Sequence, residues 1–217
     1  MKRVARGATE VLAPWVWVIL LPFAVAAASG NKSTCFSSTC SQTSILEGFS
    51  AENLWMTLLW GLVVAVTASV IPMAVIVRGA RKGKWDGHHV TNREGRLVPL
   101  VTAGASLAAG TVIMVLGDAP RTMLALAGSM FASLIVSMAI TFGLKWKISL
   151  HAGVAWAAVV TLAIVYGPWL LLIALPAALV AWSRVELGDH TTAQVLAGTA
   201  MGVIVGGGSF WLLSSSW

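Results

Sequence analysis

Residues 54 to 78 read LWMTLLWGLVVAVTASVIPMAVIVR, and Arg78, the last of them, is the only charged residue in this run. A helix needs about 20 mostly apolar residues to span the hydrocarbon core of a bilayer. The run therefore predicts one transmembrane helix.

The whole chain has the same apolar character. Of its 217 residues, 58% are hydrophobic and 10% are charged, and the mean hydropathy is +0.85. Soluble domains carry about 25% charged residues, so an ordinary soluble domain is excluded. Several tryptophans lie near the ends of apolar runs, where interfacial belts form in membrane proteins; they are Trp15, Trp55, Trp85, Trp146, Trp182 and Trp211.

Further apolar runs predict helices on either side of the first. Together the runs cover about residues 11–29, 54–78, 98–117, 121–143, 150–167, 168–182 and 191–213. The turn signal Gly167-Pro168 separates two runs that are short for a full span. The sequence thus predicts an all-α, polytopic transmembrane bundle of about six or seven helices.

The N-terminal run allows two interpretations. Basic residues at positions 2, 3 and 6 precede it, and the small residues 26–29 end it. This order is typical of a secretory signal peptide, but a retained helix is the favoured interpretation. We divide the chain into residues 1–53, a membrane anchor or signal-like segment with an extracytoplasmic loop, and residues 54–217, the transmembrane core.

Basic residues are distributed unevenly between the two faces. If the chain crosses at each helix, residues 1–10, 79–97, 144–149 and 183–190 share one face. That face, with Arg78 at its edge, holds 12 of the 14 basic residues, and only Lys32 and Arg121 lie opposite. Positive charge is concentrated on the cytoplasmic side of membrane proteins, which predicts that this face is cytoplasmic.

The two cysteines, Cys35 and Cys40, lie in the loop on the opposite face. Two thiols five residues apart in an oxidising compartment predict a small disulfide loop, and a pair of free thiols is the alternative.

The polar, reactive residues are gathered in three segments of the basic face, and all four histidines lie in them. Residues 86–96 contain His88, His89, Arg93 and Arg96; residues 145–151 contain Lys147, Ser149 and His151; residues 183–190 contain Ser183, Arg184 and His190.

This arrangement suits phosphate chemistry. The second and third segments open predicted helices, and helix N-termini offer N–H groups and a partial positive charge to phosphate. Arginine adds planar, charged donors that match phosphate oxygens. Two histidines can divide the reaction, one attacking phosphorus and the other protonating the leaving oxygen. A single such histidine is more often structural, but four on one face favour catalysis.

The three segments resemble the signature of the type 2 phosphatidic acid phosphatases, integral membrane lipid phosphatases related to the vanadium haloperoxidases. That signature has a Lys-x6-Arg-Pro, a Ser-Gly-His and a Ser-Arg-x5-His-x3-Asp element. The third element matches as Ser183, Arg184 and His190, and the second as Ser149 and His151. The likeness covers about residues 86–205 and implies that residues 54–217 form a phosphatase-like core.

The chain departs from the family pattern at several positions. Leu150 replaces the glycine of the second element, and Gln194 stands at the aspartate position of the third. In the first element, His89 stands at the lysine position and Leu97 at the proline position.

The resemblance implies a role for each matching residue. His190 would be the nucleophile that forms a phosphohistidine, and His151 the general acid. Gln194 would orient the His190 imidazole through its carbonyl oxygen, and Glu186 or Asp189 is a candidate for the missing negative charge. The phosphoryl oxygens would be held by Arg96 and Arg184, with help from His89, Arg93, Lys147 and Ser149.

Other chemistries find less support in the sequence. Asp86, His88 and His89 could bind a metal ion, but no second cluster of carboxylates completes a site. No Walker-type nucleotide loop and no Gly-x-Ser-x-Gly sequence occurs. Membrane orientation and anionic lipid explain the basic surface better than nucleic acid does.

We therefore expect a metal-independent, cofactor-free hydrolase of a lipid phosphate or polyprenyl (di)phosphate. Its partners would be the bilayer and its lipid substrate, and it would work at the cytoplasmic face of the plasma membrane. The alternative is a relative that has lost catalysis and binds anionic lipid or serves as a transport or scaffold subunit. Gln194 and Leu150 favour that alternative.

Overall fold

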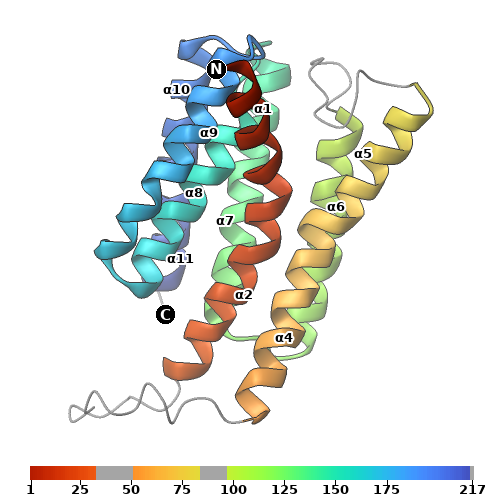
Figure 1. Ribbon diagram of the computed structural model, residues 1–217. Helices are drawn as coiled ribbons and strands as arrows, with labels where there is room; N and C mark the ends of the chain where they lie inside the picture. Colours follow the sequence, from red (N-terminus) through yellow and green to blue (C-terminus); the bar gives the residue numbers. More distant parts are fainter. Residues whose placement is uncertain (33–50, 84–96, 216–217) are drawn as a thin grey trace.

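The computed structural model describes residues 1–32, 51–83 and 97–215, and this part of the chain is helical (Figure 1). The first rod consists of α1 (Lys2–Val11) and α2 (Pro14–Lys32), and the second of α4 (Ala51–Ala65), η1 (Val66–Val70) and α5 (Ile71–Arg81). Then come α6 (Leu97–Leu116), α7 (Arg121–Met138) with η3 (Ala139–Gly143), and α8 (Leu150–Tyr166). The last two rods are η4 (Pro168–Ile173) with α9 (Ala174–Glu186), and α10 (Thr192–Met201) with η5 (Gly202–Gly207) and α11 (Gly208–Ser215).

The predicted class, an all-α polytopic bundle, is confirmed. In the described residues, 6 helical rods are long and apolar enough to cross a membrane. In addition to these, α8 is a shorter apolar helix. Large apolar side chains such as Leu116, Leu172 and Leu175 are exposed on the outside of the bundle. An outer surface of this kind suits lipid rather than water, and these features are those of a multi-pass membrane protein.

Successive rods run in opposite directions, so their connections alternate between two ends of the bundle (Figure 1). The N-terminus, the α7–α8 connection and the α9–α10 connection lie at one end, which we call the site end. The α6–α7 turn and the end of α11 lie at the other. The arrangement agrees with the prediction that residues 144–149 and 183–190 share a face.

One predicted boundary is wrong. We expected the first helix to begin near residue 11, but α1 begins at Lys2. Its buried residues are Ala5, Ala8 and Thr9, which are spaced three and four residues apart and so lie on one face of the helix. That face packs against α9. Tertiary contact therefore stabilises a short helix that would be marginal alone.

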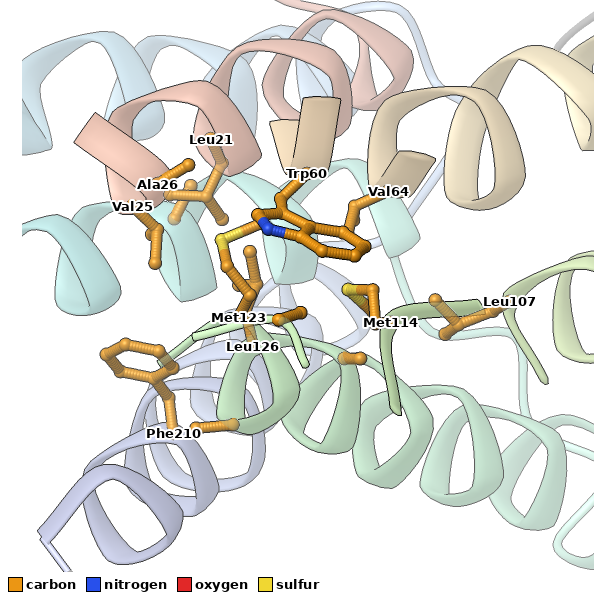
Figure 2. Packing of buried hydrophobic residues seen from close by; sticks show 14 residues of the cluster. Leu21, Val25, Ala26, Trp60, Val64, Leu107, Met114, Met123, Leu126 and Phe210 are labelled. Atoms are coloured by element: carbon orange, nitrogen blue, oxygen red, sulfur yellow. The ribbon is translucent and has the colours of Figure 1, made fainter. Parts of the chain in front are cut away.

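The main hydrophobic core lies in the half of the bundle near the α6–α7 turn. In Figure 2 the indole of Trp60 lies between α2 and α7, beside Met123 and close to Met114. Leu21 and Val25 of α2 are members of the same buried cluster. The core at this end therefore ties the N-terminal rod to the middle of the bundle and leaves the site end to polar residues.

Candidate active site

The turn between α9 and α10 sets the position of His190. Gly188 adopts φ +75°, a left-handed conformation that favours glycine. The N–H groups of Gly188 and Asp189 donate to the carbonyls of Val185 and Arg184, at 2.9 and 3.2 Å, which is the Schellman arrangement of a helix end. The chain reverses there, and His190 follows immediately.

The first turn of α10 is fixed by a capping box between Thr191 and Gln194. The Gln194 N–H donates to Oγ1 of Thr191 at 3.3 Å. In return, the Thr191 N–H donates to Oε1 of Gln194 at 3.1 Å. The same Oε1 lies 3.2 Å from Nδ1 of His190. Gln194 therefore caps the helix and holds the imidazole at once.

The last helix begins where it was expected, since α10 starts at Thr192. The expectation that Ser183 and Arg184 stand at its opening is wrong, because both lie near the end of α9, which continues to Glu186. Ser183 is fully buried, and its hydroxyl donates to the carbonyl of Val180 at 2.7 Å. Of the Ser-Arg pair, only Arg184 reaches the cavity described below.

Arg184 is 2% exposed, and it is the largest of the fully buried side chains in the described residues. Its Nη2 lies 2.9 Å from Oδ2 of Asp189, so this candidate for the charge beside His190 pairs with the arginine instead. Its Nε and Nη1 have no hydrogen-bond partner among the described residues. A buried donor without a partner costs about 1–3 kcal/mol, and more when it is charged. The arrangement is suited to an anion.

The second segment opens α8, as predicted. Ser149 is the N-cap residue, and its hydroxyl accepts from the Ala152 N–H at 3.5 Å. His151 lies in the first turn and is 8% exposed. The backbone N–H of Ser149 donates to the carbonyl of Gln194 at 3.1 Å. One backbone hydrogen bond therefore joins the segment of His151 to that of His190.

Glycines permit this close approach of α8 to α10 and to η5, which continues it. A Cβ added at Gly198 would overlap the carbonyl oxygen of Ser149, and one added at Gly202 would overlap the carbonyl oxygen of Gly153. The backbones are thus in direct contact, as in membrane helix pairs with small residues at the interface.

A cavity of about 310 Å³ begins beside the first turn of α8 and runs into the bundle. His151, Arg184 and His190 line its polar part. The remainder lies among α2, α5, α6, α7 and α8 and is mostly apolar, with Leu21, Leu107 and Leu126 on its walls. Several hydroxyl groups in the wall donate to backbone carbonyls: Ser137 donates to Ser133 of its own helix at 2.6 Å, and Ser69 donates to Trp15 of α2 at 3.3 Å.

The predicted site residues divide into three groups. His151, His190 and Arg184 line one cavity, with Gln194 bonded to His190. Lys147 and Ser149 are not among its lining residues: the Lys147 ammonium donates to the carbonyl of Asp189 at 2.9 Å, and Ser149 caps α8. His89, Arg93 and Arg96, and the cysteines Cys35 and Cys40, lie outside the described residues.

Sequence reasoning missed two parts of this site. Thr191-x-x-Gln194 is the sequence signature of a capping box, which could have shown that Gln194 has an acceptor role at the helix start. Thr9 of α1 lies against Ser183, with Oγ1 and Oγ 2.9 Å apart. Only the spacing of Ala5, Ala8 and Thr9 hinted at a helix there.

Among the described residues, no three His, Cys, Asp or Glu side chains gather as metal ligands. Comparisons of the chain with protein-family models, with curated proteins and with solved structures found no match. The chemistry of the site is therefore inferred from its own residues.

Proposed function

We propose that the protein is an integral membrane phosphatase of lipid phosphates or polyprenyl (di)phosphates, similar to the type 2 phosphatidic acid phosphatases. The observation that carries the proposal is the state of Arg184. It is buried, it lines a cavity with two histidines, and its Nε and Nη1 have no partner among the described residues. A phosphoryl group would satisfy both donors through charge-assisted hydrogen bonds.

The shape of the cavity supports a lipid as the substrate. The polar residues lie at the site end, and the walls beyond them are apolar. An apolar chain removed from water gains about 0.8 kcal/mol for each CH₂ group it buries. Because wall hydroxyls such as those of Ser129 and Ser137 donate to their own helix, they offer little to a polar ligand and do not oppose an apolar one.

The nucleophile would be Nε2 of His190. The Thr191 N–H needs an acceptor, so the oxygen of the Gln194 amide must face it and His190. In a neutral imidazole one nitrogen donates and the other accepts. Nδ1 therefore carries the hydrogen that Gln194 accepts, and Nε2 carries the lone pair that attacks phosphorus.

The reaction would take two steps. In the first, a bond forms between His190 Nε2 and phosphorus, the bond between phosphorus and the leaving oxygen breaks, and His151 gives its proton to that oxygen. Arg184 stabilises the charge on the transferring group. In the second, His151 takes a proton from water, which attacks the phosphohistidine and releases inorganic phosphate and a neutral His190.

Gln194 decides how efficient this chemistry can be. A carboxylate in its place would orient the imidazole and also stabilise the positive charge that the imidazole gains on attack. An amide does only the first. In a serine protease, a carboxylate-to-amide change lowers kcat about 10⁴-fold because it imposes the wrong tautomer. Here the capping box sets the tautomer, so the loss would be confined to the missing charge.

We place the reaction at the cytoplasmic face of the plasma membrane. The site end carries Lys2, Arg3 and Arg6 of α1, as well as Arg78 and Arg81 of α5. Positive charge near helix ends is concentrated on the cytoplasmic side.

Phosphate release by the purified protein tests the proposal. A panel of lipid monophosphates and polyprenyl mono- and diphosphates should include substrates that the protein cleaves equally well with and without EDTA. Orthovanadate should inhibit this cleavage. Loss of activity in EDTA that magnesium restores would point to a metal-dependent enzyme. Binding of anionic lipid without phosphate release would favour a relative that has lost catalysis.

A further inference from the structure

The N-terminal helix α1 (Lys2–Val11) contacts the helix that carries the arginine of the site. It packs along α9, and Arg184 lies near the end of α9. Its buried residue Thr9 is 2% exposed, and its Oγ1 lies 2.9 Å from Oγ of Ser183, the neighbour of Arg184 in the chain. This contact joins residues 174 positions apart in the sequence.

The direction of that hydrogen bond follows from the other contact of Ser183. A serine hydroxyl has one hydrogen and two lone pairs. Ser183 uses its hydrogen on the carbonyl of Val180, at 2.7 Å. Thr9 is therefore the donor and Ser183 the acceptor. Both residues are buried and neither lines the cavity, so Ser183 serves as the contact point for α1.

The charge next to Thr9 supports the same connection. Glu10 lies close enough to Arg184 for an attractive electrostatic interaction with its guanidinium. Asp189 holds Nη2 of the same guanidinium from the α9–α10 turn. The arginine is thus approached by a carboxylate from each of two segments, while Nε and Nη1 have no partner among the described residues.

We propose that α1 is part of the anion site and that Thr9 is a positioning residue for Arg184. Arg184 lies in the last turn of α9, where helices fray. The hydrogen bond from Thr9 to Ser183 fixes this turn against α1. The guanidinium then keeps two donors directed at the cavity without sampling other rotamers. This inference rests on the proposed function only in that the cavity binds a phosphate-like anion.

The test is the affinity of the full-length protein for orthovanadate, measured by calorimetry in detergent. Thr9→Val keeps the shape of the side chain and removes the donor, and it should weaken binding roughly three- to tenfold, the equivalent of one typical hydrogen bond. Thr9→Ser should restore wild-type affinity. The matched control is Thr67→Val, which removes a buried hydroxyl that donates to Val63 of its own helix at 2.7 Å, away from the cavity lining.

A double-mutant cycle separates positioning from direct contact. If Thr9 acts through Ser183, then Thr9→Val, Ser183→Ala and the double variant should weaken orthovanadate binding by similar factors. Additive losses would mean that Ser183 contacts the anion itself and would overturn the proposal. Unchanged affinity in Thr9→Val, or an equal loss in Thr67→Val, would overturn it as well. Absence of binding to the wild-type protein would instead count against the proposed function.

Discussion

Oε1 of Gln194 lies 3.2 Å from Nδ1 of His190, which precedes it by four residues. The same oxygen accepts the Thr191 N–H at 3.1 Å. A glutamine amide can turn either end toward a histidine, but only its oxygen can accept from a backbone N–H. The start of α10 therefore determines which nitrogen of His190 carries the proton.

This relationship predicts the behaviour of Gln194 variants. Gln194→Glu keeps an acceptor for both N–H groups and adds the charge that stabilises a phosphorylated or protonated imidazole, so kcat should be equal to or above that of the wild type. Gln194→Leu removes the acceptor, and kcat should fall about 10²–10⁴-fold. Phosphate-release kinetics on both variants check this. A fully active Gln194→Leu protein would show that the contact has no part in the reaction.

Loss of the capping box is the confounding effect in that experiment. Removing a side-chain cap costs about 0.5–2 kcal/mol of stability. Thr191→Ala removes the other half of the box and leaves Oε1 of Gln194 in place. It should lower the melting temperature to a similar extent, with a much smaller loss of kcat.

The ion pair between Arg184 and Asp189 predicts a rescue by anions. Asp189→Ala removes the carboxylate that pairs with Nη2 of the buried guanidinium, and loss of this partly exposed ion pair should cost about 2 kcal/mol of stability. Orthovanadate can take the place of the carboxylate, so it should raise the melting temperature more in Asp189→Ala than in the wild type. The rescue should disappear when Arg184→Ala is added. Equal shifts in all proteins would mean that the anion binds elsewhere.

The contact between α8 and α10 predicts an unusual effect of alanine. Gly→Ala within a helix normally stabilises by up to about 1 kcal/mol. At Gly198 the new Cβ would overlap the carbonyl of Ser149 and push the two histidine-bearing segments apart. Gly198→Ala should therefore lower stability by about 1–3 kcal/mol, and kcat with it. Gly208→Ala is the matched control, since nothing lies within 4 Å of its added Cβ; thermal melting and phosphate release distinguish the two.

The orientation of the bundle can be tested with single cysteines in a protein that lacks Cys35 and Cys40. Lys82 is exposed at the site end, and Arg121 is exposed at the other. If the site end is cytoplasmic, Lys82→Cys should resist a membrane-impermeant thiol reagent in intact cells, and Arg121→Cys should react. The reverse pattern would place the site outside and redirect the search for substrates to the outer leaflet.

Much of the fold could be predicted because length and apolarity alone identify membrane helices. The expected runs all became helices within one to a few residues, apart from the first. Helix α1 was missed because its buried positions Ala5, Ala8 and Thr9 are few and small, and the basic residues around them are also typical of a segment ahead of a membrane span. What stabilises α1 is its contact with α9, which no local pattern contains.

The site was predicted in part for a related reason. Residue type and helix ends led to His151, His190 and Arg184, which the bundle brings to one cavity. The family resemblance implied that Lys147 helps to hold the phosphate, but its ammonium donates to the Asp189 carbonyl. The direction of a long side chain depends on the nearest acceptor in three dimensions, and sequence spacing does not supply it.

The central claim is that His190 becomes covalently phosphorylated, and the most direct measurement is trapping of that intermediate. Purified protein is mixed with a lipid substrate that carries a radiolabelled terminal phosphate, quenched in denaturant at alkaline pH and examined for label on the protein. We expect an alkali-stable, acid-labile label on the wild type and none in His190→Ala, which should also release no phosphate. With a polyprenyl diphosphate, whose leaving phosphate needs little protonation, His151→Ala should accumulate more label than the wild type. Turnover in His190→Ala at the wild-type rate would contradict the account.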